Sequence, residues 1–125
     1  MAFLGASVLI MTSRPTLVMA ISKDASAVVV GFPGGGIDRN EEPRAAAARE
    51  LREETGIVVA PEMLAPIYAS AQHITYAPMQ GAKLPDTLQS VPFEGVVSFF
   101  TPRDMVRWAR HPEYVEKVLK QAGAL

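Results

Sequence analysis

The first quarter of the chain alternates between short apolar runs and small clusters of turn-forming residues. The runs are rich in valine, isoleucine and methionine, and the clusters TSRP and KDA separate them. Short apolar runs bounded in this way are typical of β-strands. We therefore expect three strands joined by tight turns, in a largely antiparallel or mixed sheet, at residues 6–11, 16–22 and 26–30.

A glycine-rich break precedes the strongest helical pattern of the chain. Residues 32–36 read FPGGG, and proline and glycine at this density disfavour regular structure. Pro43 suits the first turn of a helix, and Gly56 suits the left-handed position that ends one. The residues between them are mostly alanine, arginine and glutamate, so the pattern predicts a helix over residues 43–54. Residues 57–59 are expected to begin another strand.

The second half of the chain has a weaker pattern. We expect one long strand over residues 65–76, followed by a loop over residues 77–90 that mixes proline, glycine and glutamine. A loop of this length is uncommon unless it has a function or is mobile. The pattern then predicts a strand at residues 95–101, a short helix at residues 102–110 and a longer helix at residues 112–123.

Composition excludes several classes of site and partner. A hydrophobic content of 49% and a charged content of 20% are typical of a globular chain. No repeat or linker divides it, so residues 1–125 are expected to form a single domain. A net charge of −1 argues against general nucleic-acid binding but leaves room for one phosphorylated small molecule. The absence of cysteine excludes disulfides, thiolate zinc sites and a cysteine nucleophile.

The apolar start of the chain raises the alternative of a signal peptide. The stretch MAFLGASVLIMTS has neither a positively charged beginning nor a clear cleavage site, so a first strand is the better interpretation. No apolar run reaches the ~18 residues of a membrane span. We therefore expect a cytoplasmic protein that does not contact membranes.

Negative charge is concentrated on the predicted helix. Glu50, Glu53 and Glu54 stand at positions i, i+3 and i+4, so they share one face of it. Like charges at this spacing repel one another, and a hard divalent cation with oxygen ligands, such as Mg²⁺, compensates them. A zinc or copper site is disfavoured because the chain has two histidines, His73 and His111, and no cysteine.

The glycines before the helix supply the second half of this candidate site. Gly34, Gly35 and Gly36 allow the backbone to approach a ligand closely, and the helix N-terminus behind them favours negative charge. Arg49 lies four residues before Glu53 and can reach it. Carboxylates that load a metal, beside a loop that turns toward phosphates, suit the metal-assisted hydrolysis of a phosphoanhydride.

The same segment resembles the Nudix box. That pattern is Gly, five residues, Glu, seven residues, and then Arg-Glu-aliphatic-any-Glu-Glu-any-Gly-aliphatic. Gly35, Glu41 and the stretch RELREETGI at residues 49–57 fill every fixed position. The resemblance implies an α/β/α sandwich with a mixed β-sheet, in which the box forms a loop-helix-loop. It also implies a hydrolase that needs Mg²⁺ or Mn²⁺ and cleaves a nucleoside diphosphate linked to another moiety, by water attack on phosphorus.

The resemblance also assigns roles by position. The implied metal ligands are Glu50, Glu53, Glu54 and the carbonyl of Gly34. The implied catalytic residues are Glu53, Glu50, Arg49, Glu41 and Glu94. Arg49 is expected to orient a box glutamate, and Glu41 is expected near the metal or its water shell. The general base stays open between a box glutamate and Glu94, which follows the predicted loop.

The candidate substrate contacts are less specific. Many Nudix proteins carry arginines on the second strand that grip substrate phosphates, whereas this chain has only Lys23 at the end of that strand. Phosphate contacts are therefore expected from Arg39, Arg44, Lys83 or a partner subunit. Tyr76 and Phe93 flank the predicted loop and fit either core packing or a nucleobase. The implied substrate contacts are Gly35, Gly36, Arg39, Tyr76 and Phe93.

Two classes of function stay open. The first is the metal-dependent pyrophosphohydrolase, with a small nucleotide or nucleotide sugar as substrate. The second is a non-catalytic nucleotide-binding or sensor domain that retains the fold; the complete set of box carboxylates favours the enzyme. A relative of isopentenyl-diphosphate isomerase is disfavoured by the short length and the missing cysteine. Similar proteins are often homodimers, and the apolar first strand is compatible with that assembly.

Overall fold

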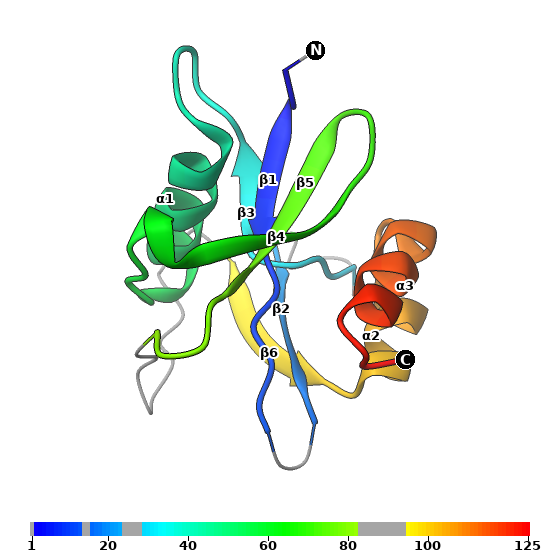
Figure 1. Ribbon diagram of the computed structural model, residues 1–125. Helices are drawn as coiled ribbons and strands as arrows, with labels where there is room; N and C mark the ends of the chain where they lie inside the picture. The colour runs from blue at the N-terminus through cyan, green and yellow to red at the C-terminus, as the bar shows by residue number, and fades with distance from the viewer. Residues whose placement is uncertain (1, 14–15, 24–28, 83–94) are drawn as a thin grey trace.

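The computed structural model describes residues 2–13, 16–23, 29–82 and 95–125. Helix α1 (Pro43–Thr55) covers one side of the strands, while α2 (Pro102–Trp108) and α3 (Pro112–Gln121) lie on the other side (Figure 1). The strands are thus enclosed between two helical layers. This arrangement confirms the predicted mixed α/β fold.

The strands form a mixed sheet of four and an antiparallel pair. Their bounds are β1 Gly5–Val8, β2 Val18–Ser22, β3 Gly34–Gly36, β4 Leu64–Ala69, β5 His73–Pro78 and β6 Val96–Phe100. In the sheet of four, β1 lies between β3 and β5, antiparallel to the first and parallel to the second, and β4 extends β5 antiparallel. In the pair, β2 and β6 run antiparallel.

Neighbouring residues at the end of β1 and within β2 face different cores. Val8 and Met19 belong to the apolar cluster beneath α1, whereas Leu9 and Val18 belong to the cluster beneath α2 and α3. Successive side chains of a strand point to opposite faces, so a strand covered on both faces must be apolar at nearly every position. This explains why β2 reads as a continuous apolar run over residues 18–21 instead of an alternating pattern.

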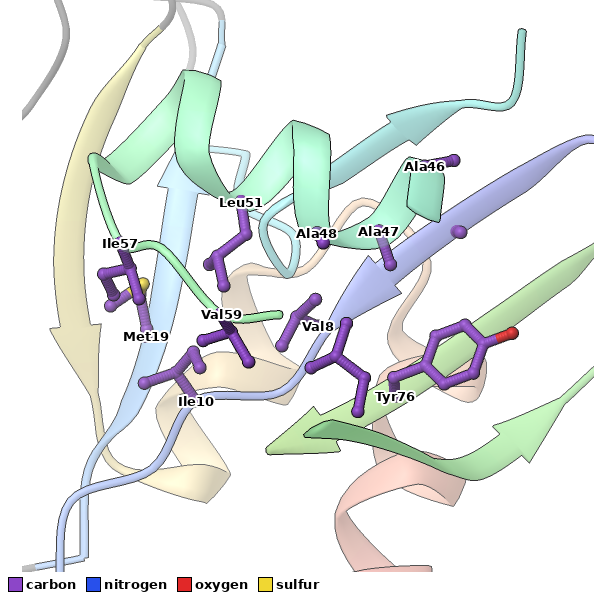
Figure 2. Packing of buried hydrophobic residues seen from close by; sticks show 12 residues of the cluster. Val8, Ile10, Met19, Ala46, Ala47, Ala48, Leu51, Ile57, Val59 and Tyr76 are labelled. Carbon is purple, nitrogen blue, oxygen red and sulfur yellow. The ribbon is translucent and has the colours of Figure 1, made fainter. Parts of the chain in front are cut away.

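Helix α1 begins and ends where local sequence signals place it. Pro43 occupies its first turn, and Gly56 follows it with a left-handed φ of 78°, donating its N–H to the Arg52 carbonyl at 2.9 Å. One face consists of alanines and Leu51, which are buried against the sheet. Figure 2 shows Leu51 pointing from the helix toward Val8 and Val59. The small alanine side chains allow the helix to lie close to the strands that carry the site.

The glycine run forms strand β3 instead of a break in regular structure. It pairs antiparallel with β1, and the register places Gly35 opposite Ala6. A Cβ added at Gly34 would lie 2.5 Å from the Ser7 Cβ, so a residue with no side chain is required for this close approach. The strand depends on a partner that is distant in sequence, which local propensity does not reveal.

The long strand predicted over residues 65–76 is two antiparallel strands, β4 and β5. The chain turns between them, where the Ser70 N–H donates to the His73 carbonyl at 2.9 Å. The turn contains neither glycine nor proline, which are the residues that usually mark turns in a sequence. A shift of register between Pro66 and Tyr68 adds an irregularity to β4.

Two further predicted strands differ from the structure. Residues 57–59 form no strand; Ile57 and Val59 are buried in the core beneath α1 instead, and a short 3-10 turn, η1 (Pro61–Met63), follows. Of the strand predicted at residues 26–30, residues 26–28 lie outside the described part of the chain. Val30 forms an isolated bridge with Ala109.

Some predictions concern residues that the structure does not describe. The loop predicted over residues 77–90 is described as far as residue 82, with a turn closed by the Ala82 N–H and the Met79 carbonyl at 3.0 Å. Lys83, Phe93 and Glu94 lie outside the described residues. Within the described ranges, none of the helices combines the length and the apolar character needed to cross a membrane.

Candidate active site

The glycine strand β3 and helix α1 bring the backbone next to two box carboxylates. The Gly34 N–H donates to Glu54 Oε1 at 2.8 Å. A Cβ added at Gly35 would lie 2.7 Å from the Glu50 carboxyl carbon. The second contact needs a residue without a side chain at position 35, so Gly35 allows the strand to lie against the Glu50 carboxylate.

Arg49 gathers three of the predicted acidic residues. Its Nε donates to Glu41 Oε2 at 2.8 Å and its Nη2 to Glu41 Oε1 at 3.0 Å, which makes a bidentate pair. Its Nη1 donates to Glu50 Oε1 at 3.0 Å and to Glu53 Oε2 at 3.2 Å, and its Nη2 also donates to the Gly36 carbonyl at 3.1 Å. A planar guanidinium with a fork of donors suits such a set of oxygens.

These contacts stabilise opposite charges on both partners. The hydrogen bond from Arg49 lowers the pKa of Glu41 below its usual value, even though partial burial opposes this shift. The hydrogen bond to Glu41, together with the one to Glu50, raises the pKa of Arg49. The Asp38 N–H adds a bond to Glu41 Oε1 at 3.0 Å. Arg49 therefore stays cationic, Glu41 stays anionic, and their relative position is fixed.

Glu54 differs from the other box glutamates because its side chain is fully buried. Burial raises its pKa to about 7, against the opposing effects of Lys23 and of the Gly34 N–H. Its Oε1 accepts the bond from Gly34, but among the described residues its Oε2 accepts no hydrogen bond. The Nζ of Lys23 lies 3.2 Å from Oε2, as an ion pair, and also donates to the Gly34 carbonyl at 2.7 Å.

The three box carboxylates are therefore held differently. Glu54 is buried beside Lys23, whereas Glu50 and Glu53 contact Arg49, and the Glu53 side chain is 42% exposed. In the part of the chain that is described, no three His, Cys, Asp or Glu side chains are grouped closely enough to hold a metal ion. The donors are all oxygens, and one buried carboxylate oxygen lacks a hydrogen bond. This donor set fits a hard divalent cation, whose arrival requires side-chain movement.

A cavity of about 720 Å³ lies on the far side of β3. Gly34, Gly35 and Gly36 form part of its wall, together with residues of β1, β5 and α3. Among the described residues that line it none is acidic, whereas Lys23 and Arg110 contribute positive charge. A cavity with this lining suits an anionic ligand.

A chain of hydrogen bonds connects this cavity to the core. His73 Nε2 lies 2.9 Å from Ser7 Oγ, which lies 2.8 Å from Thr75 Oγ1, which in turn lies 2.7 Å from the Tyr114 hydroxyl. Burial, followed by the nearby His111, lowers the pKa of His73. His73 begins strand β5. The sequence carries no motif for this network because its members come from three separate elements.

Two of the predicted substrate contacts lie away from this cavity. Tyr76 is buried in the core beneath α1, and the Arg44 guanidinium lies 5.5 Å from its ring centre, which favours packing over nucleobase stacking. Arg39 is exposed in the turn before α1. Its neighbour Asn40 has a φ of 63°, a left-handed conformation that asparagine tolerates better than most residues. Neither arginine is among the described residues that line the cavity.

Comparison with known proteins decides the family. The sequence profile of the NUDIX domain matches residues 1–118. The chain belongs to the Nudix family. The resemblance inferred from residues 35–57 is thus confirmed over almost the whole chain.

Individual relatives of this Nudix chain are distant. An RNA pyrophosphohydrolase from Roseobacter denitrificans is 38% identical over 50 residues, which are 40% of this chain and 31% of that protein. The matched stretch therefore spans less than a third of that relative. A MutT NUDIX hydrolase from Burkholderia pseudomallei has a TM-score of 0.68 at 21% identity, covering 94% of this chain and 95% of that one. An Ap4A hydrolase from C. elegans, solved as a binary complex, has a TM-score of 0.66 at 19% identity, covering 95% and 96%. These two similarities show the fold.

Proposed function

We propose that the protein is a metal-dependent pyrophosphohydrolase that cleaves a nucleoside diphosphate linked to another moiety, by water attack on phosphorus. The supporting observation is the double role of β3. One side of this strand touches Glu50 and Glu54, and the other side lines a cavity without a described acidic side chain. A phosphoanhydride bound across β3 would have its anionic end in the cavity and its reacting phosphate beside the carboxylates.

Glu50, Glu53, Glu54 and the Gly34 carbonyl would hold the cation, with Mg²⁺ favoured and Mn²⁺ as the substitute. When bound, such an ion polarises phosphate oxygens and lowers the pKa of a bound water. The fit rests on the all-oxygen donor set and on the Glu54 Oε2 that lacks a hydrogen bond within the described chain. We assign Arg49 the role of positioning Glu50 and Glu53, because it touches both carboxylates.

Glu53 is our first choice for the general base within the box. Its side chain is 42% exposed and one of its oxygens accepts a bond from Arg49, so the carboxylate can accept a proton from water at the edge of the site. Glu94, outside the described residues, stays the alternative base. We assign the contacts to substrate phosphates to Lys23 and Arg110, which line the cavity. Arg39 and Arg44, which are not among its described lining residues, are the second choice.

A second candidate function has one specific observation in its favour. Two box carboxylates have cationic partners within the chain itself, since Lys23 contacts Glu54 and Arg49 contacts Glu50. A nucleotide-binding or sensor domain needs no cation at this place. Such a domain would bind nucleotides in the cavity and leave them intact.

The test is a substrate panel with and without Mg²⁺. It contains nucleoside triphosphates, nucleotide sugars, dinucleoside polyphosphates and capped RNA, each assayed with the unmodified protein, Glu53→Gln and Glu54→Gln. Glu116→Gln is the matched control, because Glu116 is an exposed glutamate of α3 that pairs with Lys120. Metal-dependent cleavage of one class, lost in both box variants and kept in the control, is the expected result. Tight nucleotide binding without cleavage would favour the sensor domain.

The cytoplasmic location and the homodimer stay predictions. The first rests on the absence of cysteine in the sequence, and the second on the frequent dimerisation of similar proteins. Light scattering at several protein concentrations measures the second directly. A constant monomer mass would contradict it.

A further inference from the structure

Lys23 occupies the place that the proposed cation needs. It directly follows β2, and its ammonium donates to the Gly34 carbonyl at 2.7 Å and lies 3.2 Å from Glu54 Oε2. The Gly34 N–H bonds the other oxygen of the same carboxylate at 2.8 Å. Lys23, Gly34 and Glu54 therefore form one compact group around a single positive charge.

The two oxygens bound by this ammonium are also two of the four proposed metal ligands. A divalent cation at 2.0 to 2.6 Å from them, roughly the usual range for Mg²⁺ and Ca²⁺, would have no room for the ammonium. Repulsion between the two positive charges adds to the steric conflict, most strongly beside a buried carboxylate. Lys23 and the divalent cation are therefore alternative occupants of one place.

The Lys23 ammonium also has a second position available, in the cavity. Its side chain is 52% exposed although Glu54 is fully buried, and Lys23 lines the cavity on the far side of β3. A lysine carries its charge on a flexible four-carbon stem. None of the described cavity residues is acidic, so an anionic ligand there would be the natural new partner.

We propose that Lys23 is the counterion of Glu54 until a divalent cation displaces its ammonium, which then binds the substrate. In the metal-free protein it neutralises Glu54; when the cation binds the Gly34 carbonyl and Glu54, the ammonium moves into the cavity and contacts an anionic group of the substrate. Metal loading and substrate binding are thereby coupled through one side chain. The inference rests on the proposed function, because it takes the metal ligands from there.

The first experiment compares Lys23→Met with the unmodified protein by thermal unfolding, in chelator and in saturating Mn²⁺. Loss of the ammonium leaves a buried carboxylate without its partner, so the metal-free melting temperature should fall by roughly 5 °C. In saturating Mn²⁺ the two proteins should melt together, because the cation replaces the ammonium in both. Lys120→Met is the control: Lys120 pairs with the exposed Glu116 at 2.7 Å, and its loss should act equally with and without Mn²⁺.

Calorimetry then closes the thermodynamic cycle. If the loss is confined to the metal-free state, Mn²⁺ must bind Lys23→Met more tightly, by about tenfold for a loss near 1.4 kcal/mol. With Mn²⁺ saturating, KM for the cleaved substrate should rise by about tenfold, as expected when one charged contact is removed. An equal loss of melting temperature in both conditions would make Lys23 a purely structural partner and overturn the proposal, as would unchanged or weaker Mn²⁺ binding.

A measurement on the unmodified protein covers the case in which Lys23→Met does not fold without metal. Mg²⁺ is titrated while the NMR signals of the lysine ε-methylene groups are followed, and Lys23→Arg identifies the Lys23 signal by its disappearance. We expect that signal to shift in step with Mg²⁺ binding while the Lys120 signal stays in place. A Lys23 signal that does not move as Mg²⁺ binds would overturn the proposal.

The outcomes separate this inference from the proposed function. Metal-dependent hydrolysis without any sign of competition at Lys23 overturns the inference alone. If neither the unmodified protein nor Lys23→Met binds Mn²⁺ or Mg²⁺, both the inference and the metal dependence of the proposed function fail. Metal binding that appears only in Lys23→Met would show that the ammonium and the cation compete for one place, but it would overturn the proposed displacement, because the cation then fails to remove the ammonium from the unmodified protein.

Discussion

The two sides of β3 differ in charge and in the way the chain builds them. On the side of α1, Glu41, Glu50 and Glu53 meet around Arg49, and all four come from one short segment. On the other side, the cavity combines residues of β1, the end of β2, β5 and the start of α3. A metal site needs ligands at fixed spacing, which one helix provides, whereas a substrate cavity needs a shape, which several elements provide.

Removal of Arg49, which lies at the centre of the acidic side, should cause the largest loss of activity. Arg49→Ala deletes the contacts to Glu41, Glu50 and Glu53 and leaves their charges to repel, so kcat should fall by roughly 10²–10³-fold with a smaller change in KM. Arg49→Lys should not restore it, since an ammonium cannot form the bidentate pair with Glu41. Steady-state kinetics measure both variants. Arg52→Ala is the control on the same helix, where Arg52 is exposed; an equal loss there would contradict the prediction.

The buried Glu54 makes the metal-free protein sensitive to pH. Its pKa is about 7 in the folded state, against an ordinary value of 4.5, so the folded state binds this proton more tightly than the unfolded chain does. The free energy of unfolding should therefore fall as pH rises from about 4.5 to about 7, by up to about 3 kcal/mol from this group. Above that range the full cost of the buried charge is present.

Urea unfolding in chelator, between about pH 5 and about pH 8, measures this effect. The difference in unfolding free energy between Glu54→Gln and the unmodified protein isolates Glu54 from the other titrating groups, and it should shift in favour of the variant as pH rises. Glu116→Gln should show no such trend at the same pH values, because Glu116 is exposed and paired with Lys120. A pH-independent difference for Glu54→Gln would show that its pKa is not raised.

Substitutions at two neighbouring glycines should affect stability and activity differently. Alanine at Gly34 would place its Cβ 2.6 Å from the Ser7 Cα; backbone cannot yield, so unfolding free energy should drop by about 1–3 kcal/mol. Alanine at Gly35 would meet first the end of the Glu50 side chain, at 2.7 Å, which can turn away. Gly35→Ala should therefore keep most of its stability and lose activity, by about tenfold or more, as the Glu50 carboxylate is displaced.

Thermal unfolding and kinetics on the two glycine variants test this contrast. Gly31→Ala is the stability control, because a Cβ there meets no atom within 4 Å. Full activity in Gly35→Ala would mean that the position of Glu50 does not matter. Equal stability losses at the two glycines would contradict the distinction between backbone and side-chain obstacles.

A single substitution on the cavity side should have a smaller effect on activity and stability. Tyr114→Phe removes the hydroxyl that lies 2.7 Å from Thr75 Oγ1, and one such hydrogen bond contributes about 1 kcal/mol. We expect a lower melting temperature and a raised KM with nearly unchanged kcat. Tyr68→Phe is the matched control, since its ring packs edge-on against Tyr114 at 5.4 Å. A fall in kcat for Tyr114→Phe would instead indicate that this hydroxyl contributes to the chemical step at the box carboxylates.

Helix α1 and its acidic residues could be predicted because their signals are local. Pro43, the alanine run and Gly56 lie within the helix they define, and the carboxylate spacing follows from the helical repeat. The contact from Arg49 to Glu53 follows from the same repeat. The bond from Arg49 to Glu41 does not, because it bridges the turn before the helix. The helical repeat also suggests that Glu50, Glu53 and Glu54 share an environment, which the structure does not support.

The strands were harder to predict where pairing overrides local composition. Gly34–Gly36 is a strand only because β1 lies beside it, and residues 57–59 are not one because no neighbour pairs with them in the described structure. Residues 65–76 turn at a place that has no glycine or proline. Strand pairing depends on tertiary contacts, which local composition does not reveal.

The sequence by itself determined the family, the acidic segment and the helix that presents it, because each of these depends on residues a few positions apart. Only the tertiary structure decided that Glu54 is buried while Glu53 is exposed, that Lys23 lies between Glu54 and the Gly34 carbonyl, and that His73, Ser7, Thr75 and Tyr114 form one network. Burial and long-range contacts depend on which elements pack together. That packing is a property of the whole chain, and no short stretch of residues encodes it.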